Sequence, residues 1–482
     1  MPQSRTSTTQ KRAASRNTSG ASTAAKRKGA QTGRDVGRSQ RQRLESVQTT
    51  PSHKNPRPTK RLDIYVFGTN CYGELGLGDA TKKTELPRPV LNPKLPADTV
   101  GVTYLTIGGV HSAAITHDNR ILTWGVNDDG ALGRDTTQSP EDVKMKDAGD
   151  EESDDDDEAN YNLKEGTPLP VDDSNFPKGT VFTQLAATGS ATFALTEDGL
   201  VYGWGTFTDN SGSKQFSPTV KIQKTPTLMP GLSKVTQLSA GAEHVLALTS
   251  DRVVFGWGSN EQQQLGRRRV TRNAPSNLTP AECAVPSNIV SIGTGSYHSF
   301  AVDKSGHVYG WGSNNFGQTG IFSSAGQNNA IVPYPTKATT LKGVSQIQGG
   351  KDHSLAITQE GRCLSWGRID NKALGVNAKD LDPSSIILDA YDRPRILKAP
   401  TALEIQNPVS LGIGTDHSFV ITDNGHAYSW GFNVQRQAGQ PGDIDEVEYP
   451  TLLSNKHVDG KKLVLAAAGG QFSIVAGEHS AK

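Results

Sequence analysis

The feature that most constrains this 482-residue chain is a Trp-Gly pair that recurs along most of its length. Glycine follows all six tryptophans, which are Trp124, Trp204, Trp257, Trp311, Trp366 and Trp430. Phe67-Gly68 is a seventh copy that carries phenylalanine instead. Most copies lie 53 to 57 residues apart, and the interval grows to 80 residues before Trp204 and to 64 before Trp430. This period indicates a fold assembled from several copies of one small unit.

A second element precedes each tryptophan and shows how a unit folds. It reads GGVHSAAIT, TGSATFALT, AGAEHVLALT, TGSYHSFAV, GGKDHSLAIT and GTDHSFVIT. Glycine turns such as Asp198-Gly199 and Asn424-Gly425 separate it from the Trp-Gly pair, and such turns between alternating apolar residues are strong hairpin signals. The proline-bearing residues 334–339 predict a weaker fourth strand at an edge of the sheet. Each unit is therefore predicted to be a small antiparallel sheet.

The two ends of the repeat predict a closed ring. The first copy, DIYVFGTNCYGELGLG, has no histidine element before it, and the last element, AAAGGQFSIVAG, has no Trp-Gly pair after it. If these halves pair, they complete the seventh sheet and leave no exposed edge. We therefore expect an all-β, seven-bladed propeller over residues 61–482, in which each tryptophan packs between blades.

Composition agrees with a turn-rich β protein. The chain contains 51 glycines and 26 prolines, and only 6% of its residues are aromatic. No apolar run is long enough for a membrane span, and the first ten residues lack the apolar segment of a signal peptide. The three cysteines are far apart and form no C-x-x-C pattern, which favours a reducing compartment.

Charge divides the chain into two parts. Residues 1–60 contain 14 Lys and Arg, two acids and no aromatic residue. The segment therefore carries a charge of about +12, whereas the net charge of the whole chain is +1. Such a segment is predicted to be a disordered basic tail attached to an acidic body. A further disordered insertion is expected over residues 141–165, which contain the acidic run EESDDDDE.

The repeat resembles the regulator of chromosome condensation family, the nuclear exchange factors for the GTPase Ran. The resemblance covers roughly residues 63–477 and is carried by the sevenfold Gly-x-x-His, Asp-Gly and Trp-Gly pattern, by GELGLGD and GALGRD, and by WGTFTDNSG in the third unit. It implies a disk with one face for the GTPase and another for chromatin. It also implies that residues 207–214, a segment found in one unit only, form a wedge loop against the nucleotide-binding region of the GTPase. The wedge residues are Phe207, Thr208, Asp209, Asn210, Ser211 and Gly212.

The resemblance also assigns candidate contacts. Those for the GTPase are His353, Asp352, Glu243, Asn315, Arg267 and His111. His353 is expected to touch the partner from the surface, while most of the repeated histidines are expected to bond local backbone in turns. Those for nucleosomal DNA and histones are Lys11, Arg12, Lys26, Arg27, Lys28, Arg268 and Arg269. The tail clusters also resemble a bipartite nuclear localisation signal for importin, so a nuclear, chromatin-associated protein is expected.

Several positions depart from the family pattern. They are Cys71, Ser190, Thr192, Thr208 and Phe472, of which Thr192 and Phe472 are interpreted as replacing histidines. Five histidines in different units cannot reach one metal ion, and no set of residues for bond chemistry or nucleotide binding is present, so no cofactor is expected. Two other functional classes stay open: an adaptor that docks chromatin or a ubiquitin ligase without exchange activity, and a propeller that acts as a receptor or inhibitor.

Overall fold

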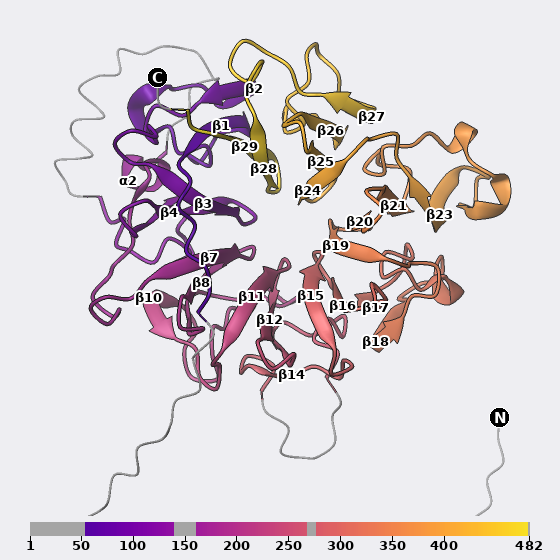
Figure 1. The fold of residues 1–482 in the computed structure, drawn as a ribbon, viewed down its shortest axis with the longest axis horizontal. Coiled ribbons are helices and arrows are strands. Elements are labelled where there is room, and N and C mark those ends of the chain that lie inside the picture. Colours follow the sequence, from indigo (N-terminus) through magenta and orange to yellow (C-terminus); the bar gives the residue numbers. More distant parts are fainter. Residues whose placement is uncertain (1–53, 139–160, 268–275, 481–482) are drawn as a thin grey trace, which may run out of the picture. The chain divides into compact units, whose positions relative to one another are not determined.

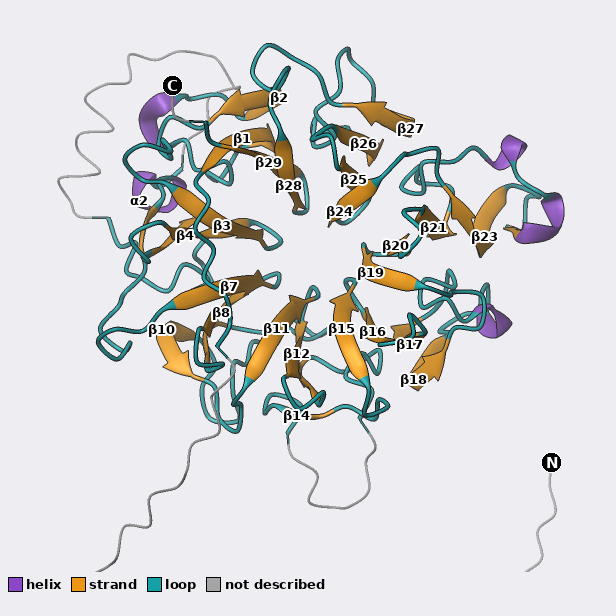
Figure 2. Ribbon diagram, in the orientation of Figure 1, coloured by secondary structure: helices purple, strands orange, loops and turns teal. Residues whose placement is uncertain are grey.

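A ring of seven sheets around a central channel forms the described part of the chain. The computed structural model describes residues 54–138, 161–267 and 276–480. Six of the sheets have four strands and one has five, and neighbouring strands are antiparallel throughout (Figures 1 and 2). The prediction of a seven-bladed propeller is confirmed.

We number the blades along the chain and give their strands from the channel outward. Blade 1 contains β28 (Leu463–Ala468), β29 (Phe472–Glu478), β1 (Leu62–Thr69) and β2 (Glu85–Leu91). Blade 2 contains β3 (Val102–Ile107), β4 (His111–Thr116), β5 (Ile121–Gly125) and β6 (Leu169–Pro170). Blade 3 contains β7 (Phe182–Ala187), β8 (Ala191–Thr196), β9 (Val201–Gly205) and β10 (Gln223–Leu228).

The remaining blades follow the same order. Blade 4 contains β11 (Val235–Ala240), β12 (His244–Thr249), β13 (Val254–Gly258) and β14 (Ala281–Glu282). Blade 5 contains β15 (Ile289–Thr294), β16 (His298–Asp303), β17 (Val308–Ser313) and β18 (Ile331–Lys337). Blade 6 contains β19 (Val344–Gly349), β20 (His353–Thr358), β21 (Cys363–Arg368), β23 (Pro394–Ala402) and β22 (Ile386–Leu388). Blade 7 contains β24 (Pro408–Ile413), β25 (His417–Thr422), β26 (Ala427–Phe432) and β27 (Glu446–Leu452).

The copied motifs form the contacts between blades. The six tryptophans are completely buried. Gly205, after Trp204, has a φ of +99°, and a Cβ atom there would lie 2.3 Å from the carbonyl oxygen of Ser190. Gly133, in the Leu-Gly motif of blade 2, lies so close to Trp204 that a Cβ atom would be 2.8 Å from the indole ring. The glycines thus let one blade accept the tryptophan of the next, and the buried indole contributes about 1.5–3 kcal/mol.

Blade 1 closes the ring as expected. Strand β1 pairs with β29 from Leu62 opposite Glu478 to Gly68 opposite Phe472. The predicted fourth strand near residues 334–339 is also confirmed, as β18 at the outer edge of blade 5. Both results follow from the incomplete repeats and the proline positions noted above.

Two predicted boundaries are wrong by a few residues. The tail was expected to extend to residue 60, but residues 54–61 lie along the propeller. There the buried Asn55 donates from Nδ2 to the carbonyl oxygens of Thr196 (3.1 Å) and Val235 (2.8 Å). The acidic insertion was expected to reach residue 165, but Tyr161 is buried and donates its hydroxyl to the carbonyl oxygen of Gly78 at 2.8 Å. Residues 1–53 and 139–160 lie outside the described residues.

Antiparallel pairing gives the ring two faces with different connections. The turns between first and second strands share one face with the loops after the Trp-Gly pairs, and we call it the wedge face. In the described parts of these loops lie five short helices: η1 (Gly78–Ala80), α2 (Leu163–Gly166), η2 (Phe322–Ser324), η3 (Ala378–Asp380) and η4 (Pro383–Ser385). The opposite face, which we call the hairpin face, carries the glycine turns between second and third strands. Residues 54–61 contact this hairpin face, because Lys54 pairs with Glu197 (3.1 Å) and Arg57 donates to the carbonyl oxygen of His117.

Candidate functional site: the wedge face

The wedge loop, residues 207–214, is an ordered hairpin that projects from blade 3. Thr208 bridges Lys214, and the amide of Asp209 donates to the carbonyl oxygen of Ser213 at 3.0 Å. The Asp209 carboxylate accepts from the amides of Ser211 and Ser213, both at 2.9 Å. Residues 209–213 are exposed. The tip therefore has a fixed shape and is available to a partner.

An aromatic cluster fixes the base of the wedge loop. Phe207 and Phe216, on the two sides of the hairpin, are 2% and 3% exposed and stack on each other with centroids 6.3 Å apart. Phe193 stacks on both rings and meets Trp257 edge to face at 5.4 Å. Such pairs add about 0.5–1.5 kcal/mol beyond burial. The wedge loop thus stands on the core between blades 3 and 4.

The junction between blades 3 and 4 differs chemically from most of the other junctions between blades. In blades 2, 3, 5, 6 and 7, the indole Nε1 donates to a backbone carbonyl of the preceding blade. The Nε1 of Trp257 has no acceptor among the described residues, because the wedge loop occupies the place of the Leu-Gly motif that would supply one. The aromatic cluster therefore replaces the usual polar contact.

Carboxylates surround the wedge loop on this face. Glu243, in the turn before β12, accepts from the amide of Thr208 at 2.7 Å through Oε2. Burial raises the pKa of Glu243 to about 7, against the opposing effect of that hydrogen bond. Burial also raises the pKa of Tyr297, with further contributions from Glu243, Glu261 and Asp352. Residues of blades 4, 5 and 6 are thus brought together in one acidic region.

The second candidate region lies over blades 5 and 6. Asp352 pairs with Arg368 at 3.4 Å, and Arg368 pairs with Asp370 at 2.6 Å. Burial raises the pKa of the Asp352 carboxyl, although Arg368 opposes the shift. The Arg368 guanidinium lies 5.1 Å from the centre of the Phe316 ring. Asn315, beside Phe316, accepts from the amide of Ala330 at 2.8 Å and is partly exposed, so both Asp352 and Asn315 lie on the face where the resemblance put them.

The repeated histidines do not have the surface roles expected of them. His353 and His111 are completely buried, so the prediction that they contact a partner from the surface is wrong. The expectation of local backbone bonds for the others is also wrong, because each ring reaches a hydroxyl in the next blade. The pairs are His111–Thr192, His244–Ser299, His298–Ser354, His353–Ser418 and His417–Ser473, at 2.8 to 2.9 Å.

The hydroxyls in these pairs fix the histidine tautomer. Ser299, for example, donates its proton to the carbonyl oxygen of Gln264 at 2.8 Å, so Nε2 of His244 must donate to the serine. Burial lowers the pKa values to about 4 for His111 and His353 and to about 3 for His244, His298 and His417. Neutral histidines therefore join the blades as hydrogen-bond donors.

The strand register shows which residues replace the repeated histidine, and it corrects one of the two predicted replacements. Ala191 lies opposite Gly205 as His111 lies opposite Gly125, so Ala191 rather than Thr192 stands at the histidine position of blade 3. Thr192 occupies the hydroxyl position and accepts from His111. Phe472 does replace the histidine of blade 1, and the Oγ of Ser112 across that junction has no partner among the described residues.

Three other predicted positions have clear environments. Arg267 points into its own blade, where it donates to the carbonyl oxygens of Gly256 and Thr279 and, at 3.2 Å, of Ser276. This guanidinium is committed to internal acceptors, so the expected free contact is not supported. Cys71 is exposed on the wedge face, and Thr208 forms the base of the wedge loop. Lys11, Arg12, Lys26, Arg27, Lys28, Arg268 and Arg269 lie outside the described residues.

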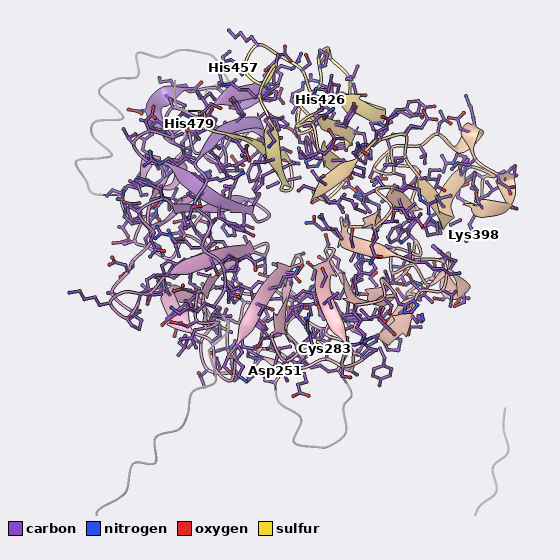
Figure 3. The ribbon with its side chains drawn as sticks, in the orientation of Figure 1. Asp251, Cys283, Lys398, His426, His457 and His479 are labelled. Carbon is purple, nitrogen blue, oxygen red and sulfur yellow. The ribbon has the colours of Figure 1, made fainter. Side chains whose placement is uncertain are left out.

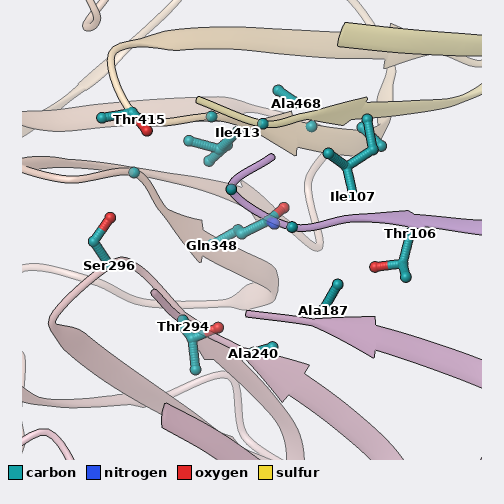
Figure 4. Close-up of a pocket in the computed structure, with 18 of the residues that line it drawn as sticks. Thr106, Ile107, Ala187, Ala240, Thr294, Ser296, Gln348, Ile413, Thr415 and Ala468 are labelled. Carbon is teal, nitrogen blue, oxygen red and sulfur yellow. The ribbon is translucent and has the colours of Figure 1, made fainter. Parts of the chain in front are cut away.

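The channel offers no evident chemistry. Its cavity of about 340 Å³ is lined by the inner strands and the glycine turns (Figure 4), and among the described residues no acidic, basic or histidine side chain lines it. Within residues 54–138, 161–267 and 276–480, no three His, Cys, Asp or Glu side chains are grouped as metal ligands would be. Over the same residues, no helix is both long and apolar enough to cross a membrane.

Comparison with known proteins identifies relatives over most of the chain. A family model described as "RCC1-like domain" matches residues 63–475. Protein pim1 of Schizosaccharomyces pombe is 40% identical over 87% of this chain and 75% of its own length. The guanine nucleotide exchange factor SRM1 of Saccharomyces cerevisiae is 37% identical over 86% of this chain and 87% of its own.

Solved structures agree with this result. The crystal structure of Prp20p from Saccharomyces cerevisiae, described with its binding to Gsp1p and histones, covers 89% of this chain and 94% of its own. The match has a TM-score of 0.77 and 33% identity. A structure of yeast RCC1 (Prp20) bound to Kap60 matches with a TM-score of 0.79 and 32% identity, over 93% of this chain and 97% of its own.

Proposed function

This chain belongs to the regulator of chromosome condensation family, and on that premise we propose that it is a guanine nucleotide exchange factor for a Ran-type nuclear GTPase. The observation that carries the proposal is the wedge loop, a preformed hairpin in blade 3 whose sequence occurs in one unit only. A relative that matches 86% of this chain is an exchange factor. The repeats build the ring, and the unique segment acts on the partner.

The exchange mechanism requires no bond chemistry. The GTPase docks on the acidic wedge face, and the exposed tip at residues 209–213 enters its nucleotide-binding region and disturbs the magnesium and phosphate contacts. The factor then binds the nucleotide-free GTPase more tightly than the loaded one. By linkage, a returning nucleotide weakens the complex by the same ratio. The cellular excess of GTP sets the direction of exchange.

The docking contacts are partly exposed side chains of the wedge face. Glu243 and Asp352 attract basic side chains of the GTPase, and Asn315 supplies an amide beside them. His353 and His111 act indirectly, because each leads a strand whose preceding turn lies on the wedge face. His353 directly follows Asp352, so its bond to Ser418 helps to hold that carboxylate in place.

The basic tail provides a second interaction. Residues 54–61 lie along the hairpin face, so residue 54 is held on the side opposite the wedge loop. The basic side chains of the tail bind either the phosphates of nucleosomal DNA or importin; they are Lys11, Arg12, Lys26, Arg27 and Lys28. Arg268 and Arg269 add positive charge for chromatin binding. The Prp20p and Prp20–Kap60 structures are the related cases that support these partners and a nuclear location.

A GDP-release assay tests the proposal. Catalytic amounts of the protein are added to a Ran-type GTPase loaded with fluorescent GDP, and release is expected to accelerate by orders of magnitude. A variant with residues 209–213 replaced by two glycines should lose most of this acceleration, whereas Asp251→Ala on the hairpin face should keep it. Wild-type protein that fails to accelerate release but binds nucleosomes would identify it as a chromatin adaptor.

A further inference from the structure

Side chains from both neighbouring blades hold the wedge loop. From blade 4, Glu243 accepts from the amide of Thr208 at 2.7 Å, and Glu261 accepts from the amide of Asn210 at 2.8 Å. From blade 2, Asp129 pairs with Lys214. Each contact places a carboxylate oxygen on a donor of the hairpin. A hydrogen bond to a carboxylate is stronger when the carboxylate is charged than when it is neutral.

Glu261 acts at the tip of the hairpin, where the other hydrogen bonds, to Asp209, all lie within the wedge loop itself. The pairing between the two sides of the wedge loop ends at Asp209 and Ser213, and the aromatic cluster lies below Thr208. The amide of Asn210 lies beyond both. Glu261 comes from the loop after the Trp257-Gly258 pair, about 50 residues further along the chain. Its carboxylate therefore fixes the tip relative to the adjacent blade.

We propose that Glu261 is a positioning residue for nucleotide exchange, and that with Glu243 and Asp129 it holds the wedge loop in the orientation in which it enters the GTPase. This inference rests on the exchange function proposed above. A hairpin fixed in advance loses little conformational freedom when the partner docks, so more of the binding energy is available to displace the nucleotide. Loss of one restraint lowers the fraction of molecules with a correctly oriented tip.

Three variants test this role. Glu261→Ala removes the acceptor, and Glu261→Gln keeps an acceptor oxygen without the charge. Glu360→Ala is the matched control, because Glu360 is an exposed carboxylate on the hairpin face that pairs with Arg362 at 2.6 Å. For each, kcat and KM of GDP release are measured together with amide hydrogen exchange in the peptide that contains residues 207–215.

The expected result separates positioning from docking. Glu261→Ala should lower kcat about fivefold to tenfold, as expected for the loss of one solvent-exposed hydrogen bond, while KM changes less than about twofold. Hydrogen exchange in the wedge peptide should become faster. Glu261→Gln should recover most of kcat and of the protection, and Glu360→Ala should match wild type in both measurements.

Two outcomes would overturn the inference. One is wild-type kcat and wild-type hydrogen exchange in Glu261→Ala, which would show that the tip needs no support from blade 4. The other is a large rise in KM with kcat unchanged, which would make Glu261 a docking contact. If wild-type protein itself releases no GDP, the exchange proposal fails, and the hydrogen-exchange comparison still decides whether Glu261 restrains the wedge loop.

Discussion

Replacing His353 by alanine tests whether the repeated histidine is a joint between blades. The ring is completely buried and binds the Oγ of Ser418 at 2.9 Å. Losing that hydrogen bond costs about 1 kcal/mol. Removing a buried ring of this size costs roughly 2–3 kcal/mol more, because the cavity fills only in part. We therefore expect His353→Ala to lower the free energy of unfolding by about 3–4 kcal/mol.

Urea titration followed by tryptophan fluorescence provides the measurement. His426→Ala is the control, because His426 lies exposed in a glycine turn of the hairpin face (Figure 3) and its loss should change stability by less than about 0.5 kcal/mol. A double-mutant cycle with Ser418→Ala should give a coupling energy near 1 kcal/mol. A loss below about 1 kcal/mol for His353→Ala, as a surface residue would give, would refute the assignment of this histidine to the core.

Three other predictions follow from the same contacts. The buried histidines have folded pKa values of about 3–4, below the unfolded value of about 6.5, so the unfolded chain binds protons first and stability should fall between about pH 6.5 and 4. Each buried histidine changes the free energy of unfolding by up to about 1.4 kcal/mol per pH unit. Urea midpoints that stay constant over this pH range would contradict the assignment of these histidines as buried and neutral. In Phe472→His, the new ring should bind Ser112, with a coupling of about 1 kcal/mol to Ser112→Ala; additive single effects would contradict this pairing. Glu74→Gln should raise the urea midpoint at pH 7.5, because burial raises the pKa of the Glu74 carboxyl and a neutral glutamine avoids the cost of burying its charge. Glutamines occupy the equivalent site in blades 4, 5 and 7. An unchanged or lower midpoint would argue against a charge penalty at Glu74.

The candidate site was predictable only in part. The wedge loop could be found from the sequence, because it breaks the repeat in one unit, and Glu243, Asp352 and Asn315 do lie on its face. Glu261 and Asp129 were missed, since nothing in their local sequence distinguishes them from other loop carboxylates. Their importance depends on where the hairpin of blade 3 projects, which is a property of the packed ring.

The sequence by itself determined the number of blades, the first three strands of each and the closure through a shared blade, but not the fifth strand of blade 6. These features depend on local periodicity, on glycines at turns and on two half repeats, all of which are visible along the chain. Only the tertiary structure decided what the histidines do, where the tail meets the propeller and how the wedge loop is held. The partners in those contacts lie about 50 to 180 residues apart in the sequence, so no local pattern records them. Packing one blade against the next creates them.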